Sequence, residues 1–279
     1  MSVDPLAFDP AVLTAAVETG DSAATHRLAV LTAMGLGVPQ DWPRALALLE
    51  QAAEAGFEPA HAERSLLGQV DLARWLTPPA PRALMTAPPV LAMENFLDAA
   101  VCDWMRERAE AGMAPAMVYD PATGAARQED VRTNHAAQLD LSRMDVVTAL
   151  VRERIARAAG LPIPGLEWTQ VLRYAVGQTF DWHVDWLDPA LPGYADDLRR
   201  RGQRIATCLV YLNDDYEGGE TAFEAGNLRW RGRKGDALMW ANTLPDGSID
   251  RRTRHAGLPP TSGEKWVLSQ WLRGRAPTA

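Results

Sequence analysis

Apolar residues recur at three- and four-residue spacing across residues 10–72, which predicts amphipathic helices. Two segments in this stretch, AAVETGDSAATHRLAVL (15–31) and QAAEAGFEPAHAERSLL (51–67), superimpose at a shift of 36 residues and align Gly20 with Gly56. A helical repeat of this length is typical of stacked helix pairs. Asp41 and Pro43 suit the N-cap and the first turn of one helix. We expect a small all-α helical segment over residues 1–76.

The segment between the two copies, MGLGVPQDWPRALALLEQAAEAG (34–56), resembles the Sel-one-like repeat, a relative of the tetratricopeptide repeat. The resemblance extends over about one and a half repeats, fewer than the roughly three that such arrays usually need. After it, residues 77–89 (TPPAPRALMTAPP) contain five prolines. So many prolines argue against a helix or a central strand, and they predict an extended linker.

From residue 90 onward the pattern changes from helical to strand-like spacing. Two helices are expected, over 95–112 and 143–159, with a loop-like stretch over 113–134. Alternating, β-branched and aromatic residues then predict strands over 167–176, 179–184, 204–212, 236–241 and 265–273. The predicted fold is therefore α+β: a helical repeat, then a linker, then a double-stranded β-helix (jelly-roll) barrel braced by helices over residues 90–279.

Composition narrows the function classes. The 28 basic against 36 acidic residues leave a net charge of −8, which argues against a nucleic-acid partner. No apolar run reaches the roughly 18 to 20 residues of a membrane span. Two cysteines, Cys102 and Cys208, are too few for a disulfide framework or a four-cysteine metal site. We expect a cytoplasmic protein without a membrane or nucleic-acid partner.

The best candidate for chemistry is WHVDW, residues 182–186. In a strand, His183 and Asp185 point to the same side about 6.5 Å apart, so they can present an imidazole and a carboxylate to one ion. His255 is available as a third ligand, and two histidines with one carboxylate form the facial site of non-haem Fe(II) oxygenases. By itself an HxD pair is also compatible with a simple hydrogen-bonded pair.

Lys265 lies ten residues after His255 and begins the predicted strand KWVLSQWLR. Alternation places it on one face with Val267, Ser269 and Trp271. A buried ammonium needs a carboxylate partner, so Lys265 either binds an anionic ligand or reaches water at the rim of the barrel.

Residues 90–273 resemble the prolyl 4-hydroxylase branch of the Fe(II)- and 2-oxoglutarate-dependent dioxygenases. The matching segments follow the order of that family and cover about two thirds of the chain: NFLDAAVCDWM, VRTN, QVLRYAVGQTFDWHVDW, RIATCLVYLND, EGGETAF, GDALMWAN, RHAGLPPTSGEKW and SQWLRG. The resemblance implies that His183, Asp185 and His255 bind iron. It also implies that Lys265 holds the far carboxylate of 2-oxoglutarate.

Further site residues are implied by the same resemblance. Tyr174 corresponds to a tyrosine that hydrogen-bonds the co-substrate, and Thr221 to a threonine beside it. Tyr211 and Ser269 occupy positions of further polar contacts. The substrate residues implied are Arg132, in a substrate loop, and Trp271, which would meet the bound peptide. The alternative for these residues is an ordinary structural role: hydroxyls bonded to backbone, a surface arginine and a core tryptophan.

Two features concern the substrate. Phe180 stands where related peptide hydroxylases carry a tyrosine three residues before the first iron ligand. Residues 186–203 form a long segment before the next strand, as lids and recognition segments often do.

The reaction implied is hydroxylation of a prolyl or similar residue in a peptide or protein, with decarboxylation of 2-oxoglutarate to succinate. Fe(II), 2-oxoglutarate and O₂ are the implied cofactors, with ascorbate as an optional further one. By analogy at the level of the fold, the helical repeat would recruit the polypeptide. Three alternatives stay open: a hydroxylase of a free amino acid or other small molecule, an adaptor that senses oxygen or 2-oxoglutarate, and a barrel that binds a redox-inactive metal. Nothing in the sequence determines the oligomeric state.

Overall fold

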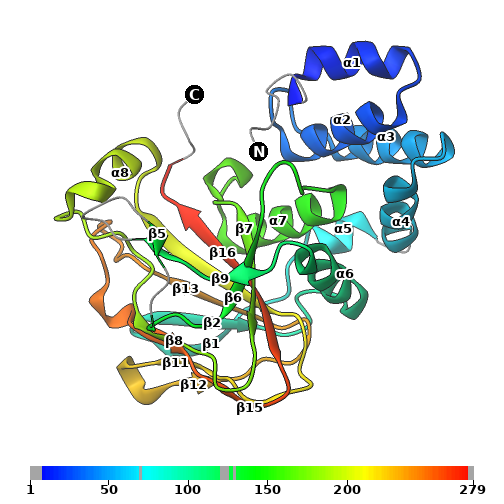
Figure 1. Cartoon of the computed structure of the whole chain (residues 1–279). Coiled ribbons are helices and arrows are strands. Elements are labelled where there is room, and N and C mark those ends of the chain that lie inside the picture. The colour runs from blue at the N-terminus through cyan, green and yellow to red at the C-terminus, as the bar shows by residue number, and fades with distance from the viewer. Residues whose placement is uncertain (1–7, 69–70, 120–125, 128–129, 276–279) are drawn as a thin grey trace. The chain divides into compact units, whose positions relative to one another are not determined.

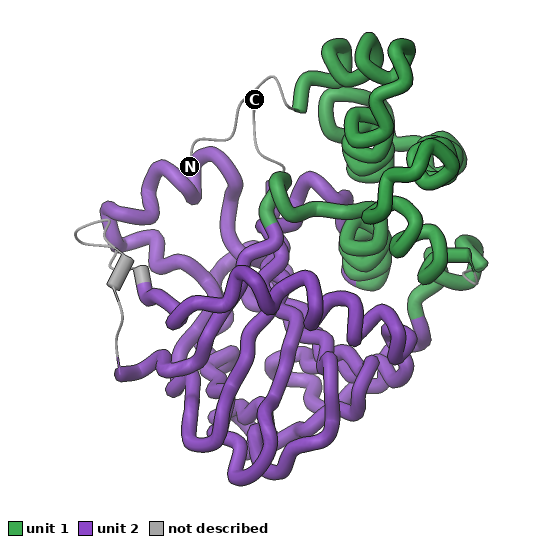
Figure 2. The backbone as a smooth tube through the Cα atoms, turned by 45° about the vertical axis from the view of Figure 1, so that its right-hand side comes forward, with its two compact units in different colours: residues 1–78, 140–158 green, residues 79–139, 159–279 purple. Residues whose placement is uncertain are grey.

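The computed structural model describes residues 8–68, 71–119, 126–127 and 130–275. The chain divides into two compact units, coloured separately in Figure 2. Unit 1 comprises Met1–Pro78 and Asp140–Ala158, and unit 2 comprises Pro79–Leu139 and Ala159–Ala279. None of the helices in the described ranges combines the length and the apolar character that crossing a bilayer requires.

Unit 1 is helical. Its helices are α1 (Pro10–Glu18), α2 (Ser22–Met34), α3 (Trp42–Glu54), α4 (Glu58–Leu67), α5 (Leu72–Trp75) and most of α7 (Val146–Ala159). The predicted start of α3 is confirmed, because Asp41 caps it by accepting a 3.0 Å hydrogen bond from the backbone N–H of Arg44, and Pro43 lies in the first turn.

The two sequence copies have the same local structure. Gly20 and Gly56, which the 36-residue shift aligns, both have positive φ angles, 87° and 82°, in the turns that precede α2 and α4. This left-handed backbone conformation favours glycine. Each copy therefore forms a turn followed by a helix.

A buried carboxylate ties three helices of unit 1 together. Oε1 of Glu63, on α4, lies 2.5 Å from Nε2 of His26, on α2. Oε2 of the same side chain accepts a 2.7 Å hydrogen bond from the backbone N–H of Val146, at the start of α7. Burial raises the pKa of Glu63, an effect that its bond to His26 partly offsets. Glu63 thus satisfies a free N–H at the start of α7.

The prediction of a linker over 77–89 was wrong. This stretch contains β1 (Arg82–Thr86) and the first residue of β2 (Pro89–Met93), which pair in antiparallel fashion. The five prolines are compatible with these strands because they precede β1, lie in the turn between the strands, or begin β2. β1 is also an edge strand, so it forms hydrogen bonds on one side only.

The expected boundary between the helical segment and the barrel also differs. Residues 140–158, expected within the barrel domain, cluster with unit 1. The reason is specific contacts of α7: the bond from Val146 to Glu63, and a 2.9 Å hydrogen bond from Gln40 to Oε2 of Glu153. Residues 79–89 belong instead to unit 2.

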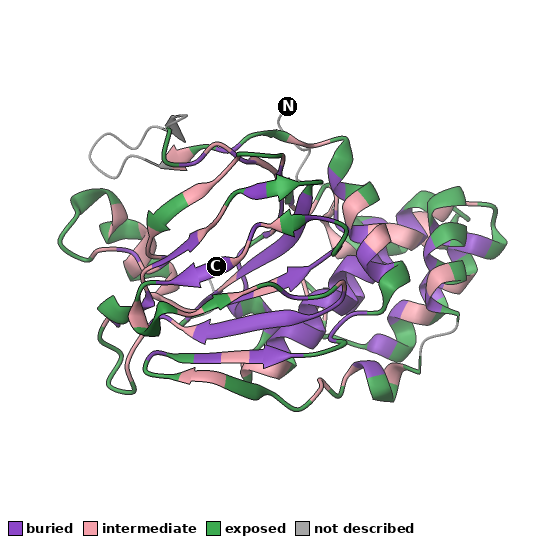
Figure 3. Cartoon of the chain, turned by 90° about the horizontal axis from the view of Figure 1, so that it is seen from below, coloured by how far each residue is buried: buried purple, intermediate pink, exposed green. Residues whose placement is uncertain are grey.

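Unit 2 contains a large antiparallel sheet of eight strands, in the order β1-β2-β13-β9-β16-β7-β6-β3 (Figure 1). Besides β1 and β2, these strands are β3 (Ala114–Pro115), β6 (His135–Leu139), β7 (Thr169–Tyr174), β9 (Arg204–Tyr211), β13 (Ala237–Ala241) and β16 (Lys265–Arg273). The central strands are buried along most of their length (Figure 3). The strands expected over 167–176, 204–212, 236–241 and 265–273 are thereby confirmed.

A smaller sheet of four strands has the order β12-β11-β14-β8. Its strands are β8 (Phe180–His183), β11 (Thr221–Phe223), β12 (Arg229–Trp230) and β14 (His255–Gly257). Two short pairs complete the strands: β10 (Glu217–Gly218) with β15 (Pro260–Ser262), and β4 (Val118–Tyr119) with β5 (Ala126–Arg127). The stretch 113–134, expected as a loop, thus includes β3, β4 and β5, and it lies partly outside the described residues.

Helix α6 (Ala99–Glu110) braces one face of the large sheet. The guanidinium carbon of Arg106 on α6 lies 5.3 Å from the ring centroid of Trp266 on β16. On the other face, the two sheets enclose a core cluster of Val90, Tyr211, Tyr216, Phe223, Leu238, Trp240 and Val267. Residues of both sheets also line one cavity beside this core.

Candidate active site

Two histidines face each other across a strand pair of the small sheet. His183, the last residue of β8, is the register partner of His255, the first residue of β14. Their ring centroids lie 4.3 Å apart. Antiparallel pairing therefore brings together two side chains that are far apart in the sequence.

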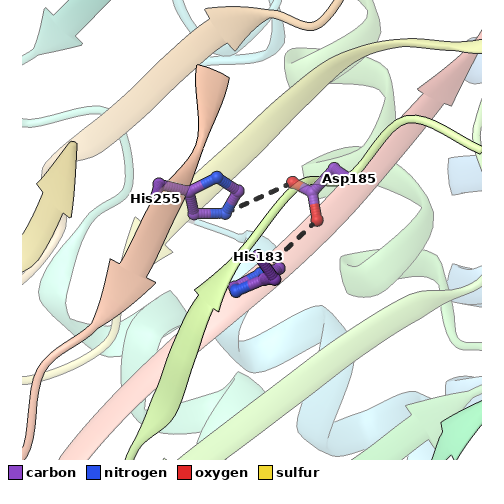
Figure 4. A group of neighbouring side chains, drawn as sticks. All are labelled: His183, Asp185 and His255. Atoms are coloured by element: carbon purple, nitrogen blue, oxygen red, sulfur yellow. Dashed lines mark ion pairs between the residues drawn. The ribbon is translucent and has the colours of Figure 1, made fainter. Parts of the chain in front are cut away.

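Asp185 follows β8 and completes a three-residue cluster (Figure 4). Its Oδ1 lies 3.7 Å from Nε2 of His183, and its Oδ2 lies 3.6 Å from Nε2 of His255. Potential ligand atoms of the three residues lie within 4.8 Å of one another. The structure thus brings together the three residues that the sequence singled out.

Hydrogen bonds fix the orientation of both imidazoles. Nδ1 of His183 lies 2.7 Å from the carbonyl oxygen of Asp181, and Nδ1 of His255 lies 2.8 Å from that of Thr253. Each Nδ1 donates to a carbonyl, so each Nε2 keeps its lone pair for a ligand. This is the tautomer that metal-ligating histidines need.

The carboxylate of Asp185 is itself held in place. Oδ2 accepts a 2.7 Å hydrogen bond from the hydroxyl of Thr207, which in turn accepts a 2.9 Å hydrogen bond from the side-chain amide of Asn242. Burial alone would raise the pKa of Asp185, but His255, His183 and the Thr207 hydroxyl together lower it below the usual value. Asp185 is therefore ionised at neutral pH.

The imidazole of His183 is neutral in these surroundings. Burial, and secondarily the neighbouring His255, lower the pKa of His183 to about 3. Two imidazoles with their Nε2 atoms free and one ionised carboxylate are a donor set that fits a ferrous ion and leaves ligand positions open on one face.

A buried lysine lines the same cavity. Lys265, the first residue of β16, is 2% exposed and pairs across the ladder with Tyr174. Its Nζ lies 5.3 Å from the ring centroids of both Tyr174 and Tyr211. Within the described part of the chain no carboxylate lies within ion-pair distance of this ammonium. Burial lowers the pKa of Lys265 to about 7, although the nearby Glu220 partly offsets the effect.

The face of β16 that carries Lys265 is the predicted one. Lys265, Val267, Ser269 and Trp271 all line the cavity that the metal-ligand cluster also lines. The cavity therefore has a donor set with an ionised carboxylate at one place, and at another an ammonium that pairs with no carboxylate of the described residues.

The predicted hydroxyl residues separate into two groups. Tyr174, Thr221 and Ser269 line the cavity, but Tyr211 does not. The hydroxyl of Tyr211 lies 2.6 Å from Oγ1 of Thr221 and donates a 3.4 Å hydrogen bond to the carbonyl of Trp230. Tyr211 thus contacts the wall residue Thr221 from behind.

Comparison with known proteins identifies the domain. The sequence profile of the 2OG-Fe(II) oxygenase superfamily matches residues 169–273. Prolyl 4-hydroxylase 1 of Arabidopsis thaliana is 32% identical over 212 residues, which cover 70% of this chain and 72% of that protein. Prolyl 4-hydroxylase subunit alpha-1 of Rattus norvegicus is 33% identical over 189 residues, covering 67% of this chain and 35% of the rat protein.

A solved structure supports the same assignment. The crystal structure of a viral collagen prolyl hydroxylase from Paramecium Bursaria Chlorella virus-1, in complex with 2OG, shares 25% sequence identity with a TM-score of 0.50. The similarity covers 66% of this chain and 95% of the viral chain.

The chain belongs to the 2OG-Fe(II) oxygenase superfamily, among the relatives of the prolyl 4-hydroxylases. Members of this superfamily use Fe(II), 2-oxoglutarate and O₂, and the donor set of His183, Asp185 and His255 fits the iron. The protein is thus a 2-oxoglutarate-dependent dioxygenase with the jelly-roll fold of that superfamily.

In this oxygenase a wider cleft adjoins the inner cavity. Arg132, Phe180, Trp271 and the ligands His183 and Asp185 line both spaces. The walls that belong to the cleft alone include Met117, Val131, Trp182, Tyr194 and Arg204. Three apolar side chains of this cleft are well exposed: Met117 by 46%, Val131 by 44% and Trp182 by 36%. The cleft therefore opens beside the metal-ligand cluster and presents both apolar side chains and arginines there.

Phe180 takes part in a stack that reaches the first metal ligand. Its ring lies 3.5 Å from that of His183, centroid to centroid, with an interplanar angle of 10°. Arg132 also lies over the ring of Phe180, with its guanidinium carbon 4.5 Å from the ring centroid. Phe180 therefore supports the imidazole by ring stacking.

The segment 186–203 contains a 3₁₀ turn (Pro192–Tyr194) and α8 (Ala195–Arg201). Its ends are tied together, because Gln203 accepts a 2.7 Å hydrogen bond from Leu187 N and donates one of 2.7 Å to Leu187 O. The side chain of Arg273 also forms an ion pair with Asp197 of α8. The segment is thus anchored to β16, and its Tyr194 lines the cleft.

Sequence reasoning missed four residues of this oxygenase site. Thr207 and Asn242 support Asp185 as described above. Glu167 accepts hydrogen bonds of 2.7 and 3.0 Å from Arg204, whose guanidinium carbon lies 3.5 Å from the ring centroid of Trp271. The segments RIATCLVYLND and GDALMWAN, which carry the family resemblance, contain Arg204, Thr207 and Asn242. The resemblance could therefore have pointed to these three residues.

Proposed function

We propose that this protein hydroxylates a prolyl or similar residue in a peptide or protein. The observation that carries the proposal is the meeting, in one cavity, of the His183–Asp185–His255 cluster and the unpaired ammonium of Lys265. The prolyl 4-hydroxylase relatives, at 32% identity over 70% of the chain, support a prolyl target.

His183, Asp185 and His255 would hold the iron through their two Nε2 atoms and the carboxylate. When bound, ferrous iron supplies the oxidation in which O₂ converts the target C–H to C–OH while 2-oxoglutarate becomes succinate and CO₂. Thr207 holds the carboxylate of Asp185 in one orientation, so the ligand set is arranged before metal binds.

Lys265 would bind the far carboxylate of 2-oxoglutarate. Its ammonium is buried and unpaired in the described structure, so an anionic partner would compensate its burial. Tyr174, Thr221 and Ser269 line the same cavity and would supply hydroxyls to the co-substrate. Tyr211 would act through Thr221, whose hydroxyl it contacts.

The outer cleft would hold the polypeptide. Its exposed apolar side chains offer more surface than a single small substrate needs. Arg132 and Trp271 line both the cleft and the inner cavity, so they would contact the residue that enters. The aromatic side chains that line this junction, Phe180 and Trp271, would exclude water from it.

Succinate release from 2-oxoglutarate, with Fe(II), O₂ and proline-containing peptides, tests this function. We expect a gain of 16 Da on the peptide in mass spectrometry, no turnover with His183→Ala, and a strongly raised 2-oxoglutarate requirement with Lys265→Ala. Lys234→Ala is the matched control, because Lys234 is the only other lysine and forms an ion pair with Asp103. A mass gain on free proline but not on peptides would contradict a polypeptide substrate.

A further inference from the structure

Arg132 is a buried cation at the junction of the inner cavity and the outer cleft. It is 7% exposed, and it lines both spaces. An isolated bridge to Phe180 of β8 fixes its backbone beside the metal-ligand cluster. Any substrate that passes from the cleft to the cluster therefore meets this side chain.

Within the described ranges, the guanidinium has only weak, uncharged partners. Nε donates a 3.3 Å hydrogen bond to the side-chain oxygen of Asn134, and Nη1 donates one of 3.3 Å to the carbonyl of Met117. Its third contact is the ring of Phe180. Among residues 8–68, 71–119, 126–127 and 130–275, no carboxylate forms an ion pair with Arg132, and its Nη2 donates no hydrogen bond.

Two other arginines of unit 2, the half-buried Arg204 and the buried Arg273, differ from Arg132 because they have carboxylate partners. Arg204 and Arg273 both form ion pairs with Glu167, at 2.7 and 2.5 Å. A guanidinium out of water is costly unless an anion compensates it. Consistent with this cost, burial lowers the pKa of Arg132, with Tyr174 and Asp185 acting in the opposite direction. Because Asp185 would also hold the metal, its charge is not available to Arg132 alone.

We propose that Arg132 is the receptor for a carboxylate of the primary substrate, so that the enzyme selects an acidic side chain next to the residue it hydroxylates. This inference rests on the proposed function. A carboxylate can accept two parallel hydrogen bonds from a guanidinium, which supplies both charge and orientation.

The substrate, rather than 2-oxoglutarate, is the source of this carboxylate. In the proposed function, Lys265 and the metal already engage the two ends of the co-substrate. Arg132 also lines the outer cleft, whereas Lys265 lines only the inner cavity.

The stack on Phe180 sets how far the carboxylate lies from the target residue. The contacts of Phe180 with Arg132 and with His183 place the guanidinium within about 8 Å of the His183 ring, roughly the span of two residues. The acidic residue should therefore be an immediate or next neighbour of the target.

A pair of peptides that differ only in charge tests the proposal: one proline flanked by Glu on both sides, the other by Gln. We expect kcat/KM to be about ten-fold or more higher for the Glu peptide. Arg132→Gln should reduce this ratio to near one, and Arg132→Lys should retain part of it. Arg82→Gln, which removes an exposed arginine paired with Glu94, should leave the ratio unchanged. A purely structural role for Arg132 would lower both rates together and preserve the ratio.

Binding to the Zn(II)- and 2-oxoglutarate-loaded protein, followed by tryptophan fluorescence, separates the possible failures. Equal affinity for the two peptides, or binding of neither, overturns the role of Arg132 even if the Arg132→Gln variant does not fold. Preferential binding of the Glu peptide without hydroxylation supports Arg132 and contradicts the proposed function instead. Arg132→Gln could instead raise the 2-oxoglutarate requirement and leave the ratio of kcat/KM between the Glu and Gln peptides unchanged. Arg132 would then bind a carboxylate of the co-substrate, and the proposal would be overturned. A preference for free proline over both peptides assigns it to a free amino acid and also overturns it.

Discussion

Thr207 donates a 2.7 Å hydrogen bond to Oδ2 of Asp185, the same oxygen that lies 3.6 Å from Nε2 of His255. One hydroxyl therefore orients the only carboxylate of the metal-ligand cluster. Thr207 is 1% exposed, so water cannot replace this hydrogen bond without entering the core.

Thr207→Val should weaken metal binding by about 10- to 100-fold, because it removes this donor at nearly constant volume. Titration calorimetry with Co(II) measures the affinity directly. Thr169→Val is the control, since Thr169 is equally buried and donates a 2.7 Å hydrogen bond to Gln270 outside the cluster. Wild-type affinity in Thr207→Val would show that the hydroxyl does not orient the ligand.

Phe180→Leu should lower the metal affinity several-fold, because the ring that stacks on His183 at 3.5 Å contributes about 1 kcal/mol to holding the imidazole. Phe180→Tyr keeps the ring and should bind Co(II) like the wild type. The same titration compares the variants. If Leu and Tyr at this position behave alike, the stack does not support the ligand.

The affinity for 2-oxoglutarate should fall as the pH rises above about 7. The pKa of Lys265 in the free protein is about 7, and a bound carboxylate would raise it by favouring the charged ammonium. Binding above that pH therefore takes up a proton, and the affinity decreases by up to about ten-fold per pH unit.

Calorimetry of the Zn(II)-loaded protein in buffers of different ionisation enthalpy measures this proton uptake. Lys265→Arg is the comparison, because an arginine stays charged and should give a flatter pH profile. A wild-type affinity that is constant from pH 7 to 9, with no proton uptake, would contradict the prediction.

Glu167→Gln should reduce the free energy of unfolding by about 3 kcal/mol, since it leaves the buried Arg273 and the half-buried Arg204 without their shared carboxylate. Burial would raise the pKa of Glu167, but Arg204 and Arg273 outweigh it and lower the pKa. This stabilisation is therefore present above the ordinary carboxyl pKa and is lost as the pH falls through the lowered value.

Urea unfolding followed by tryptophan fluorescence measures the effect. Asp196→Asn serves as the control, because the ion pairs of Asp196 with Arg199 and Arg200 are exposed and should each contribute less than about 1 kcal/mol. Equal stability losses in the two variants would mean that the buried network of Glu167 is no stronger than a surface pair.

Patterns local to one element were predictable from the sequence. Alternation along β16 correctly placed Lys265 and Ser269 on the cavity face. The helix start at Asp41 followed from its side-chain chemistry. The spacing of His183 and Asp185, two residues apart, was enough to suggest a shared ligand, because side-chain direction within a strand depends only on the backbone of that strand.

Contacts between distant elements were decided by the tertiary structure. The sequence offered His255 as a ligand, but only the register between β8 and β14 sets it opposite His183. The prolines of 77–89 argued against a central strand, yet β1 formed at the edge of the sheet by pairing with β2, and β2, which has partners on both sides, begins at Pro89. Tyr211 lies behind Thr221 instead of lining the cavity.

The sequence by itself determined the chemistry available to this protein: the ligand types, a chain with only two lysines and the order of the family segments. The tertiary structure alone decided which charges are compensated, so that Glu167 pairs with Arg204 while Arg132 pairs with no carboxylate of the described residues. The physical reason is that burial and ion pairing depend on packing between segments far apart in the chain, whereas periodicity and capping act over a few residues.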